Sequence, residues 1–508
     1  MLPALLLRTL STSVLLTLSF PRPDAGPLVL VALVPLLSFL PERKITGAFL
    51  SGWTAGFFWF FFSYNWVAHS ISHFGEVPFP LDMGVIVLLA GVHALFIGAF
   101  AALAQRIGRP SGSMDMLLLA SVWVLLELAR SWFPAPFPWL LLGTGVWKTV
   151  PLRPLFPLVG VYGASFYIFL FNVTVWKIAG GGKTGKMPPF FILAILILSP
   201  LIGVMTSRTG PGEPVRVGVV QGNFQQDLKW DEQMQDETAR VYLNLTEDAV
   251  KRGARLIVWP ETAVPVFYQA EPELAETLRG FVREKGIHLV FGSPGYEILG
   301  QEVRLYNRAY HLGPDGREEH YDKIRLVPFG EYVPLSALLP FVDKLVPGEG
   351  EFARGKWEGP FTTPVPSGLL ICYEVAFPSL VRREVLDGSR FLINVTNDAW
   401  FGRSWGPYQH LSVAAVRAAE NGVPLVRAAN TGISAVIDRT GRIREAVPLD
   451  TRGVIVTEIE TGGGMTPYTR FGDWIVMFAF AVITIKGFKI IFKWRSRKWN
   501  GSMYSETP

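Results

Sequence analysis

Two reactive side chains in the second half of the chain stand at the ends of β-rich runs, and a third precedes a loop. Glu261 and Cys372 follow the two runs, and Lys323 precedes a Pro- and Gly-containing segment that ends at Glu331. Strand ends of α/β folds are where side chains from distant segments meet. A thiol beside a lysine cation has a lowered pKa, and the thiolate is the reactive form. These residue types supply a nucleophile, a cation for an oxyanion and a general base, which is the set that acyl transfer needs.

Each of these residues also has a purely structural interpretation. Cys372, the single cysteine of the chain, suits a small buried residue at a strand end. Glu261 suits a carboxylate at a helix N-terminus, and Lys323 suits a solvated surface charge. Only the three local sequences taken together favour the catalytic interpretation.

The composition indicates that part of the chain lies in a membrane. Half of the 508 residues are hydrophobic and 18% are charged, whereas soluble domains carry roughly a quarter charged residues. A single cysteine excludes an intrachain disulfide and a thiolate metal cluster, and the seven histidines include no HExxH pair. Without a Gly-rich phosphate loop either, we expect no metal and no cofactor. The net charge of +5 does not indicate a nucleic-acid partner.

Eight apolar runs are predicted to be membrane spans. Most approach the roughly 20 helical residues that cross a hydrocarbon core, although residues 26–40 are short and follow two prolines. Residues 1–20 lack a small-x-small cleavage site, which favours an uncleaved first span over a signal peptide. The predicted spans are residues 4–20, 26–40, 46–64, 82–104, 115–131, 154–176, 188–205 and 474–492.

Basic residues in the loops between these runs orient the predicted bundle. One set of alternate loops holds seven Lys or Arg residues and the other holds four, so the positive-inside rule makes the first set cytoplasmic. Residues 206–470 are then expected on the outer side of the membrane. The first set is Arg43, Lys44, Arg106, Arg109, Lys177, Lys183 and Lys186, and the second is Arg22, Arg130, Lys148 and Arg153.

Residues 206–470 show an α/β pattern and separate residues 1–205 from a final span and basic tail at 471–508. Short β-rich runs alternate there with amphipathic helical patterns. Several runs are apolar throughout, which is typical of strands covered on both faces and predicts a layered sandwich. The β-rich runs are residues 215–220, 255–259, 288–293, 368–372, 391–394, 424–427 and 454–457, and the helical patterns are 232–252, 273–285 and 410–421.

Seven segments of this region resemble the nitrilase superfamily, and the whole chain resembles its membrane-embedded branch, the apolipoprotein N-acyltransferases. In the membrane part, ELARSWFPAPFPWLLLG (127–143) is similar to the family's fifth span and following loop. The resemblance implies an αββα sandwich inserted before the last helix of an all-α bundle of about eight spans. The seven segments are GNFQQDLKWD (222–231), WPETA (259–263), YNRAY (306–310), YDKIRLVPFGEYVP (321–334), ICYE (371–374), NVTNDAWFG (394–402) and AAENGVPLVRAANTGISAVID (418–438).

The resemblance also implies roles for matched residues. It makes Glu261 the base, Lys323 the oxyanion cation and Cys372 the nucleophile of a triad. Glu331 is implied as a second carboxylate that positions the site, and the backbone N–H of Tyr373 as an oxyanion donor. The other matched positions are Glu374, Trp230 and Asn307, and for Trp230 and Asn307 a structural role is equally compatible with the match.

The family's reaction implies two lipid substrates at the periplasmic face of the bacterial inner membrane. Cys372 is expected to take an acyl chain from a phospholipid as a thioester. The N-terminal amine of diacylglyceryl-cysteine on an apolipoprotein then receives the chain as an amide. Because water would hydrolyse the thioester, the site needs an apolar pocket.

Two apolar segments are candidates for building that pocket. Leu339 and Phe341 lie in residues 335–346, which are interpreted either as a mobile, membrane-dipping lid or as an ordinary packed loop. Trp400 and Phe401 either line the acyl path or belong to the core.

The sequence alone leaves three questions open. A membrane-tethered amidase or nitrilase-type C–N hydrolase would use the same triad with water as acceptor. A receptor or transporter with a decayed domain would have lost a triad residue, and none is lost. Glu127 and Arg130, three residues apart on a predicted helix, form either an ion pair or a lipid headgroup contact.

Overall fold

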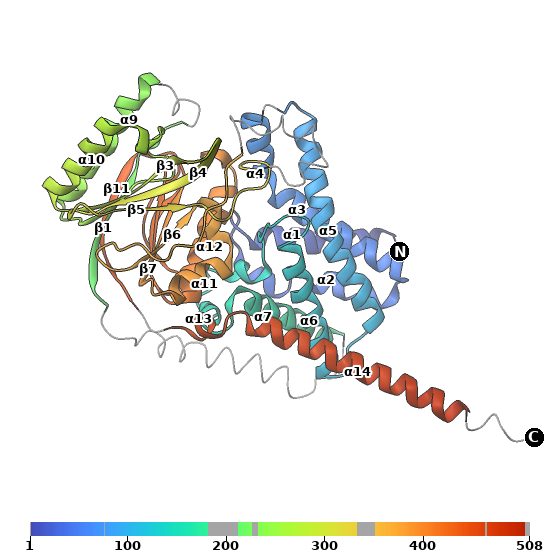
Figure 1. Ribbon diagram of the computed structural model, residues 1–508. Coiled ribbons are helices and arrows are strands. Elements are labelled where there is room, and N and C mark those ends of the chain that lie inside the picture. The colour runs from blue at the N-terminus through green and yellow to red at the C-terminus, as the bar shows by residue number, and fades with distance from the viewer. Residues whose placement is uncertain are drawn as a thin grey trace, which may run out of the picture.

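A computed structural model describes residues 2–75, 77–180, 212–225, 232–332, 351–462 and 465–502. Helices from the first 180 residues, together with the C-terminal helix, form one part, and two β-sheets with their covering helices form the other (Figure 1). The predicted span 188–205 lies outside the described residues, as do Trp230, Leu339 and Phe341.

The helical part contains apolar helices of membrane-spanning length. Among the described residues, three such helices lie within Ile45–Ser63, Leu81–Ile107 and Arg153–Ala179. Large apolar side chains such as Leu81 and Leu88 are exposed on their surface, as expected of helices that face lipid tails. The helices are α1 (Leu2–Ser19), α3 (Ile45–Ser63), α4 (Asn65–His69), α5 (Leu81–Ile107), α6 (Ser113–Arg130), α7 (Phe156–Ala179) and α14 (Trp474–Ser502).

The short run predicted as a span at residues 26–40 is not one continuous helix. It forms η1 (Gly26–Leu30), α2 (Val34–Leu37) and η2 (Leu40–Glu42), each with a proline in its first turn. Proline has no N–H to continue a preceding helix, so the segment breaks at each one. Backbone N–H groups in the breaks are bound from neighbouring helices: Leu36 donates to Thr12 of α1 at 3.1 Å, and Leu33 to Asn172 of α7 at 2.9 Å. Broken helices at membrane depth need such partners.

The α/β part consists of a six-stranded and a five-stranded sheet. The strand orders are β11-β1-β2-β3-β4-β5 and β10-β9-β8-β7-β6. Strands β1 to β3 are parallel in the first sheet and β6 to β8 in the second, and the remaining pairs are antiparallel. The strands are β1 (Pro214–Gln221), β2 (Leu256–Val258), β3 (His288–Leu299), β4 (Glu302–Leu312), β5 (Glu318–Asp322), β6 (Ser367–Ile371), β7 (Phe391–Thr396), β8 (Leu425–Ala429), β9 (Ser434–Ile437), β10 (Ile443–Val447) and β11 (Gly453–Glu460).

A pair of helices covers the outer face of each sheet (Figure 1). On the six-stranded sheet, Leu278 and Val282 belong to one buried apolar cluster with Ile257 and Leu289. The result is a layered sandwich, as the apolar strands predicted, with the α-β-β-α order that the resemblance implied. The covering helices are α9 (Glu232–Lys251) and α10 (Pro272–Lys285) on the six-stranded sheet, and α11 (Pro378–Leu386) and α12 (Gly406–Asn421) on the five-stranded sheet.

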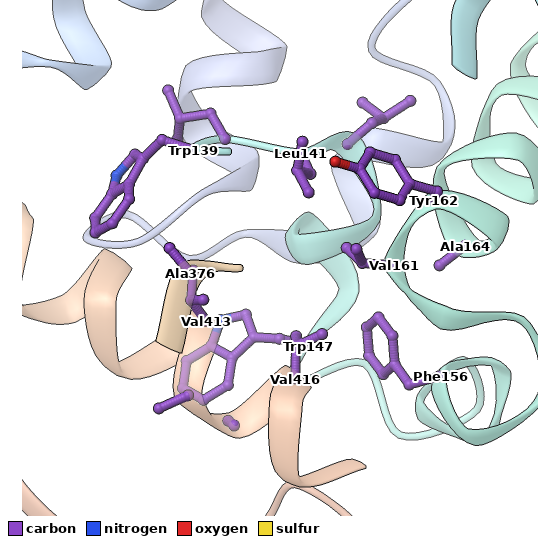
Figure 2. Packing of buried hydrophobic residues seen from close by; sticks show 14 of the residues in the cluster. Trp139, Leu141, Trp147, Phe156, Val161, Tyr162, Ala164, Ala376, Val413 and Val416 are labelled. Carbon is purple, nitrogen blue, oxygen red and sulfur yellow. The ribbon is translucent and has the colours of Figure 1, made fainter. Parts of the chain in front are cut away.

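Helix α12 faces the membrane helices, and the core continues from one part into the other. Figure 2 shows Trp139 and Trp147 of the helical part and Val161 of α7 around Val413 and Val416 of α12. All five side chains are buried and belong to a single apolar cluster. The α/β part is therefore packed directly against the helical part.

A break in α7 adds a polar contact to this packing. Gly160 has φ 65°, in the left-handed region, and a Cβ there would lie 2.5 Å from the Tyr468 ring. The break frees the backbone N–H of Val161 from the helix, and this group donates to Glu420 of α12 at 2.6 Å. Glycine at 160 is thus needed both for the backbone conformation and for space.

Candidate active site

The three predicted triad residues lie together at strand ends of the two sheets. Glu261 follows β2, Lys323 follows β5, and Cys372 directly follows β6. The Lys323 Nζ lies 3.6 Å from Glu261 Oε1, and the Cys372 thiol interacts electrostatically with both charges. All three side chains are buried. The arrangement places a thiol, a carboxylate and an ammonium close together in the interior of the protein.

Cys372 has an unusual backbone conformation. Its φ is 52°, in the left-handed region that few residues other than glycine occupy. It is also the first residue of a short 3-10 helix, η9 (Cys372–Ala376), directly after β6. A sharp turn between a strand and a helix is a recurring way to present a nucleophile, and such strain of about 1–3 kcal/mol persists only where the surroundings hold it.

Asn307 and Glu331 fix the charged groups relative to one another. Glu331 Oε1 accepts hydrogen bonds from Lys323 Nζ at 2.7 Å and from Asn307 Nδ2 at 2.8 Å. Asn307 Nδ2 also donates to Glu261 Oε1 at 2.7 Å. Glu331 therefore lies beside Lys323, where the sequence resemblance implied a positioning carboxylate, and Asn307 bridges the two carboxylates.

The second oxygen of Glu261 is bound from the other sheet. The backbone N–H of Asn397, which follows β7, donates to Glu261 Oε2 at 2.8 Å. Both carboxylate oxygens of Glu261 are thus held, one from each sheet. A general base whose orientation is fixed in this way loses little entropy when it accepts a proton.

The pKa of the thiol differs from the expectation drawn from the sequence. Lysine was expected to lower the pKa of Cys372, but burial and the Glu261 carboxylate raise that pKa by more than Lys323 lowers it. Burial alone would lower the pKa of Lys323, but Glu331 and Glu261 outweigh burial and raise it above its ordinary value. The resting site therefore holds a neutral thiol beside an ammonium, and forming the thiolate requires a base within reach.

Glu374 joins the turn that carries Cys372 to the segment that carries Lys323. It accepts hydrogen bonds from three backbone N–H groups at 2.7–3.0 Å, one just before Cys372 and two just after Lys323. The Tyr321 hydroxyl donates to both of its oxygens. Burial raises the pKa of Glu374 to about 7, although the backbone N–H groups favour the carboxylate. Its position supports a structural role next to the nucleophile.

An aromatic cluster, defined as Trp66, Phe137, Trp139, Tyr373 and Phe401, lies where the turn that carries Cys372 faces the helical part. The Tyr373 hydroxyl donates to the carbonyl of Pro136 at 2.7 Å. The Tyr373 ring lies 6.3 Å from the rings of both Phe137 and Trp139, and Phe401 lies 4.7 Å from Trp66. Apolar and water-poor surroundings of this kind are what a thioester needs.

Trp400 lies beside this cluster, at the junction of the two parts. Its ring is 4.5 Å from Phe74, and its carbonyl accepts a hydrogen bond from Ser70 at 2.6 Å. Both Trp400 and Phe401 are half-buried. Their packing against residues 66–74 shows a structural contribution, and a place on the acyl path stays a prediction.

Glu127 and Arg130 do not form the expected ion pair within the described residues. Glu127 Oε1 accepts from the backbone N–H of Leu142 at 2.7 Å. Arg130 donates to the carbonyls of Trp139 and Leu140 at 2.9 and 3.1 Å. Both side chains are buried, so neither is presented to lipid headgroups. Their charges instead hold the loop that supplies Trp139 to the aromatic cluster.

Gln409, at the start of α12, joins the two parts and was not predicted from the sequence. Its Oε1 accepts from the indole N–H groups of Trp66 and Trp139 at 3.2 and 2.8 Å. Its Nε2 donates to the carbonyls of Pro21 and Ser63 at 3.2 and 3.0 Å. The buried amide has all of its capacity satisfied. A glutamine on an amphipathic helix carries no sequence signal for such a role.

The α-β-β-α fold and its strand-end residues agree with the match of residues 216–464 to the carbon-nitrogen hydrolase family, so the α/β part belongs to that class. Residues 12–174 match the apolipoprotein N-acyltransferase N-terminal domain. The chain is 39% identical over 492 residues to the apolipoprotein N-acyltransferase of Geobacter metallireducens, covering 94% of each. It is 35% identical over 468 residues to that of Azotobacter vinelandii, covering 89% and 88%. The chain belongs to the apolipoprotein N-acyltransferase family.

Among solved structures, a carbon-nitrogen hydrolase from Helicobacter pylori is similar to the α/β part. The TM-score is 0.38 and the sequence identity is 17%. The aligned region covers 54% of this chain and 93% of that one.

Proposed function

We propose that the protein moves a fatty acyl chain from a membrane phospholipid, through a thioester on Cys372, to the N-terminal amine of diacylglyceryl-cysteine on apolipoproteins. The observation that carries this proposal is the buried Cys372, Lys323 and Glu261 constellation beside an aromatic cluster that the membrane part helps to build. The names of the relatives support the acceptor.

The first half-reaction forms the thioester. Glu261 takes the proton of the Cys372 thiol as the sulfur attacks the carbonyl carbon of the phospholipid ester. The Lys323 ammonium and the backbone N–H of Tyr373 stabilise the resulting oxyanion. The intermediate then breaks its C–O bond, and Glu261 returns the proton to the departing lysophospholipid oxygen, leaving an S–C bond on the enzyme.

The second half-reaction reverses these roles. The neutral amine of the lipid-modified N-terminus attacks the thioester carbon, and Glu261 takes the proton that the nitrogen loses. The C–S bond breaks, an amide bond forms, and the proton passes from Glu261 to the sulfur. Because the same carboxylate serves as base and acid in both halves, its orientation by Asn307 and Asn397 matters throughout.

Other residues are assigned supporting roles. Glu331 and Asn307 orient Lys323 and Glu261, and Glu374 holds the turn of Cys372 against the lysine segment. Trp230, Leu339 and Phe341 lie outside the described residues, and their proposed roles in the site and in a lid rest on the sequence alone. Trp400 and Phe401 are proposed to border the acyl path.

We further propose that the enzyme spans the bacterial inner membrane with about eight helices. Residues 1–205 would supply seven spans, 206–470 the periplasmic catalytic domain, and 471–508 the last span and a cytoplasmic tail. The loop charges and the family support this topology. Alkaline phosphatase inserted after Asp315, in an exposed turn of the catalytic domain, should be active, whereas green fluorescent protein inserted there should not fluoresce. The opposite pattern would overturn the topology.

The decisive test of the chemistry is the intact mass of the purified protein after incubation with phospholipid and no acceptor. A gain of one fatty acyl group, absent from Cys372→Ser and removed by hydroxylamine, is the expected result. Adding a diacylglyceryl-cysteine peptide should then discharge the adduct and yield an N-acylated peptide. An adduct that this peptide does not discharge would contradict the acceptor.

The alternative, a membrane-tethered C–N hydrolase, predicts a different outcome in the same assay. Water would then be the acceptor, so free fatty acid would accumulate without a stable adduct. Turnover of a small amide together with no reaction on phospholipid would favour that alternative.

A further inference from the structure

A buried polar group contacts the backbone of Cys372 from the side of the five-stranded sheet. Nε2 of His410, on α12, lies 3.1 Å from the Cys372 carbonyl oxygen. His410 is fully buried, and its ring lies 5.6 Å from Trp139 and 5.8 Å from Phe401. Because a carbonyl oxygen can only accept, Nε2 carries a hydrogen and donates it.

The other ring nitrogen of His410 is fixed by an ion pair. In this tautomer Nδ1 has no hydrogen and accepts a hydrogen bond from a guanidinium nitrogen of Arg427 at 3.0 Å, while Asp398 Oδ1 lies 2.9 Å from Nδ1. Arg427 binds Asp398 Oδ2 at 2.6 Å, and the Thr396 hydroxyl donates to Asp398 at 3.1 Å. The ring is therefore held on both sides, and it has no freedom to turn its Nε2–H away from Cys372.

Charge balance within this group leaves the ring neutral. Burial and the Arg427 cation lower the pKa of His410, against the Asp398 carboxylate. Burial alone would raise the pKa of Asp398, but that pKa lies well below its usual range, and the Arg427 cation is the largest cause of the lowering. The negative charge of Asp398 thus neutralises Arg427, and the neutral imidazole donates through Nε2.

The carbonyl that His410 holds belongs to the same planar peptide unit as the backbone N–H of Tyr373. In a trans peptide the C=O and the N–H point in opposite directions, so fixing one fixes the other. The φ of 52° at Cys372 shows that this unit sits in a conformation that the chain does not adopt on its own.

We propose that His410 is a positioning residue for the acyl transfer: by holding the Cys372 carbonyl, it aims the Tyr373 N–H at the oxyanion. Asp398 and Arg427 serve by holding the ring. The inference rests on the proposed thioester chemistry and adds residues that the triad does not include.

The test compares two reactions of the same thiol in His410→Leu. Thioester formation develops an oxyanion, whereas alkylation by iodoacetamide does not. Only thioester formation therefore needs the backbone N–H of Tyr373 in the correct position. We expect the single-turnover rate of thioester formation to fall about 10²-fold, the effect of an approximately 1 Å misplacement. The phospholipid KM should stay close to that of the wild type, since the oxyanion forms only after the attack and is absent from the bound substrate. Alkylation should keep most of its rate.

Variants on the same helix control for general damage. His410→Gln retains an N–H donor of similar reach and should recover most of the thioester rate that His410→Leu loses. Ser412→Ala removes a buried hydroxyl that donates to the Gln409 carbonyl at 2.6 Å, and it should react at the wild-type rate. If His410→Leu fails to fold, Asp398→Asn replaces it, with the expectation of slower thioester formation and retained alkylation.

Three outcomes would overturn the proposal. The first is thioester formation at the wild-type rate in His410→Leu, or in Asp398→Asn if that variant replaces it. The second is an equal fall in the rates of alkylation and of thioester formation. The third is a rate of thioester formation in His410→Gln that is no higher than in His410→Leu. Failure of the wild-type protein to form any thioester would instead overturn the proposed function. The two failures are therefore distinguishable.

Discussion

The two sides of Cys372 are built in different ways. The charged side, consisting of Glu261, Lys323, Glu331 and Asn307, comes from strand ends, a loop and the middle of β4 in the α/β part, with contacts of 2.7–3.6 Å. The aromatic cluster draws on both parts of the molecule and is held by single hydrogen bonds and ring contacts. The charged side supplies what any acyl transfer of this class needs. Excluding water from the thioester depends on how the α/β part meets the membrane helices.

The largest effect should come from Glu261→Gln. Loss of the base should slow thioester formation by roughly 10²- to 10⁴-fold. Alkylation of the thiol by iodoacetamide at pH 8 should become faster, because the Glu261 charge raises the pKa of Cys372 and the variant removes it. Exposed Glu302, which pairs with Arg304, offers a matched control as Glu302→Gln. Slower alkylation in Glu261→Gln would contradict this electrostatic account.

A smaller loss is expected from Asn307→Ala. The variant removes both hydrogen bonds that link Glu261 and Glu331, each worth about 1.5–3 kcal/mol when a charged partner is involved. If one such contribution is lost from the transition state, the thioester rate falls roughly ten- to hundredfold. Single-turnover mass spectrometry measures this rate. An unchanged rate would show that Lys323 and the backbone suffice to orient the base.

On the aromatic side, Tyr373→Phe should affect water exclusion more than catalysis. It removes the hydrogen bond to Pro136, worth about 0.5–1.5 kcal/mol, and keeps the backbone N–H and the ring. We expect thioester formation near the wild-type rate, and faster release of free fatty acid from the isolated acyl-enzyme. Tyr296→Phe, in β3 of the six-stranded sheet, is the control. Slow thioester formation in Tyr373→Phe, with an unchanged lifetime of the thioester, would contradict the difference between the charged side and the aromatic side.

The smallest effect concerns Glu374 and the pH dependence of stability. Its pKa is raised to about 7 in the folded protein, so the folded state favours the protonated form. The protonated Glu374 side chain therefore contributes to the free energy of unfolding. This contribution is complete below the ordinary carboxyl pKa of about 4.3 and is lost as the pH rises through about 7. The unfolding temperature of the wild type should therefore fall between pH 5 and pH 8, as measured by scanning fluorimetry. In Glu374→Gln the part of this fall that comes from Glu374 should be absent. An identical slope in the two proteins would show that Glu374 remains ionised throughout.

The sequence could indicate that Glu261 and Cys372 lie close together because each follows a recognisable apolar run, whereas Asn307 was named only from the resemblance. The apolar runs that precede Glu261 and Cys372 became β2 and β6, which lie in different sheets, and the packing of the two sheets brings these strand ends together. Strands β4 and β5 were not predicted. They are polar and partly exposed at their ends, so the alternation of apolar residues is weak there.

The aromatic cluster and the group around His410 could not be predicted in the same way. Trp66, Trp139 and Gln409 are far apart in the sequence, and only tertiary packing brings them together. His410 was one of seven histidines without a metal-binding spacing, and Asp398 stood in a matched segment without an assigned role. The pKa of Cys372 was also missed, because burial is a property of the folded chain rather than of the neighbouring residue types.

Gln409 and His410 are consecutive residues that face different partners. One binds four groups of the helical part, and the other binds the backbone of the nucleophile. Within the described residues, two neighbouring side chains of α12 therefore link the backbone of Cys372 to the helical part, which we expect to fix the distance of the sulfur from the membrane helices. In a bilayer that is too thin or too thick, the whole molecule must tilt or deform the surrounding lipid. Activity measured in vesicles whose lipids differ in acyl-chain length should therefore be highest at one bilayer thickness.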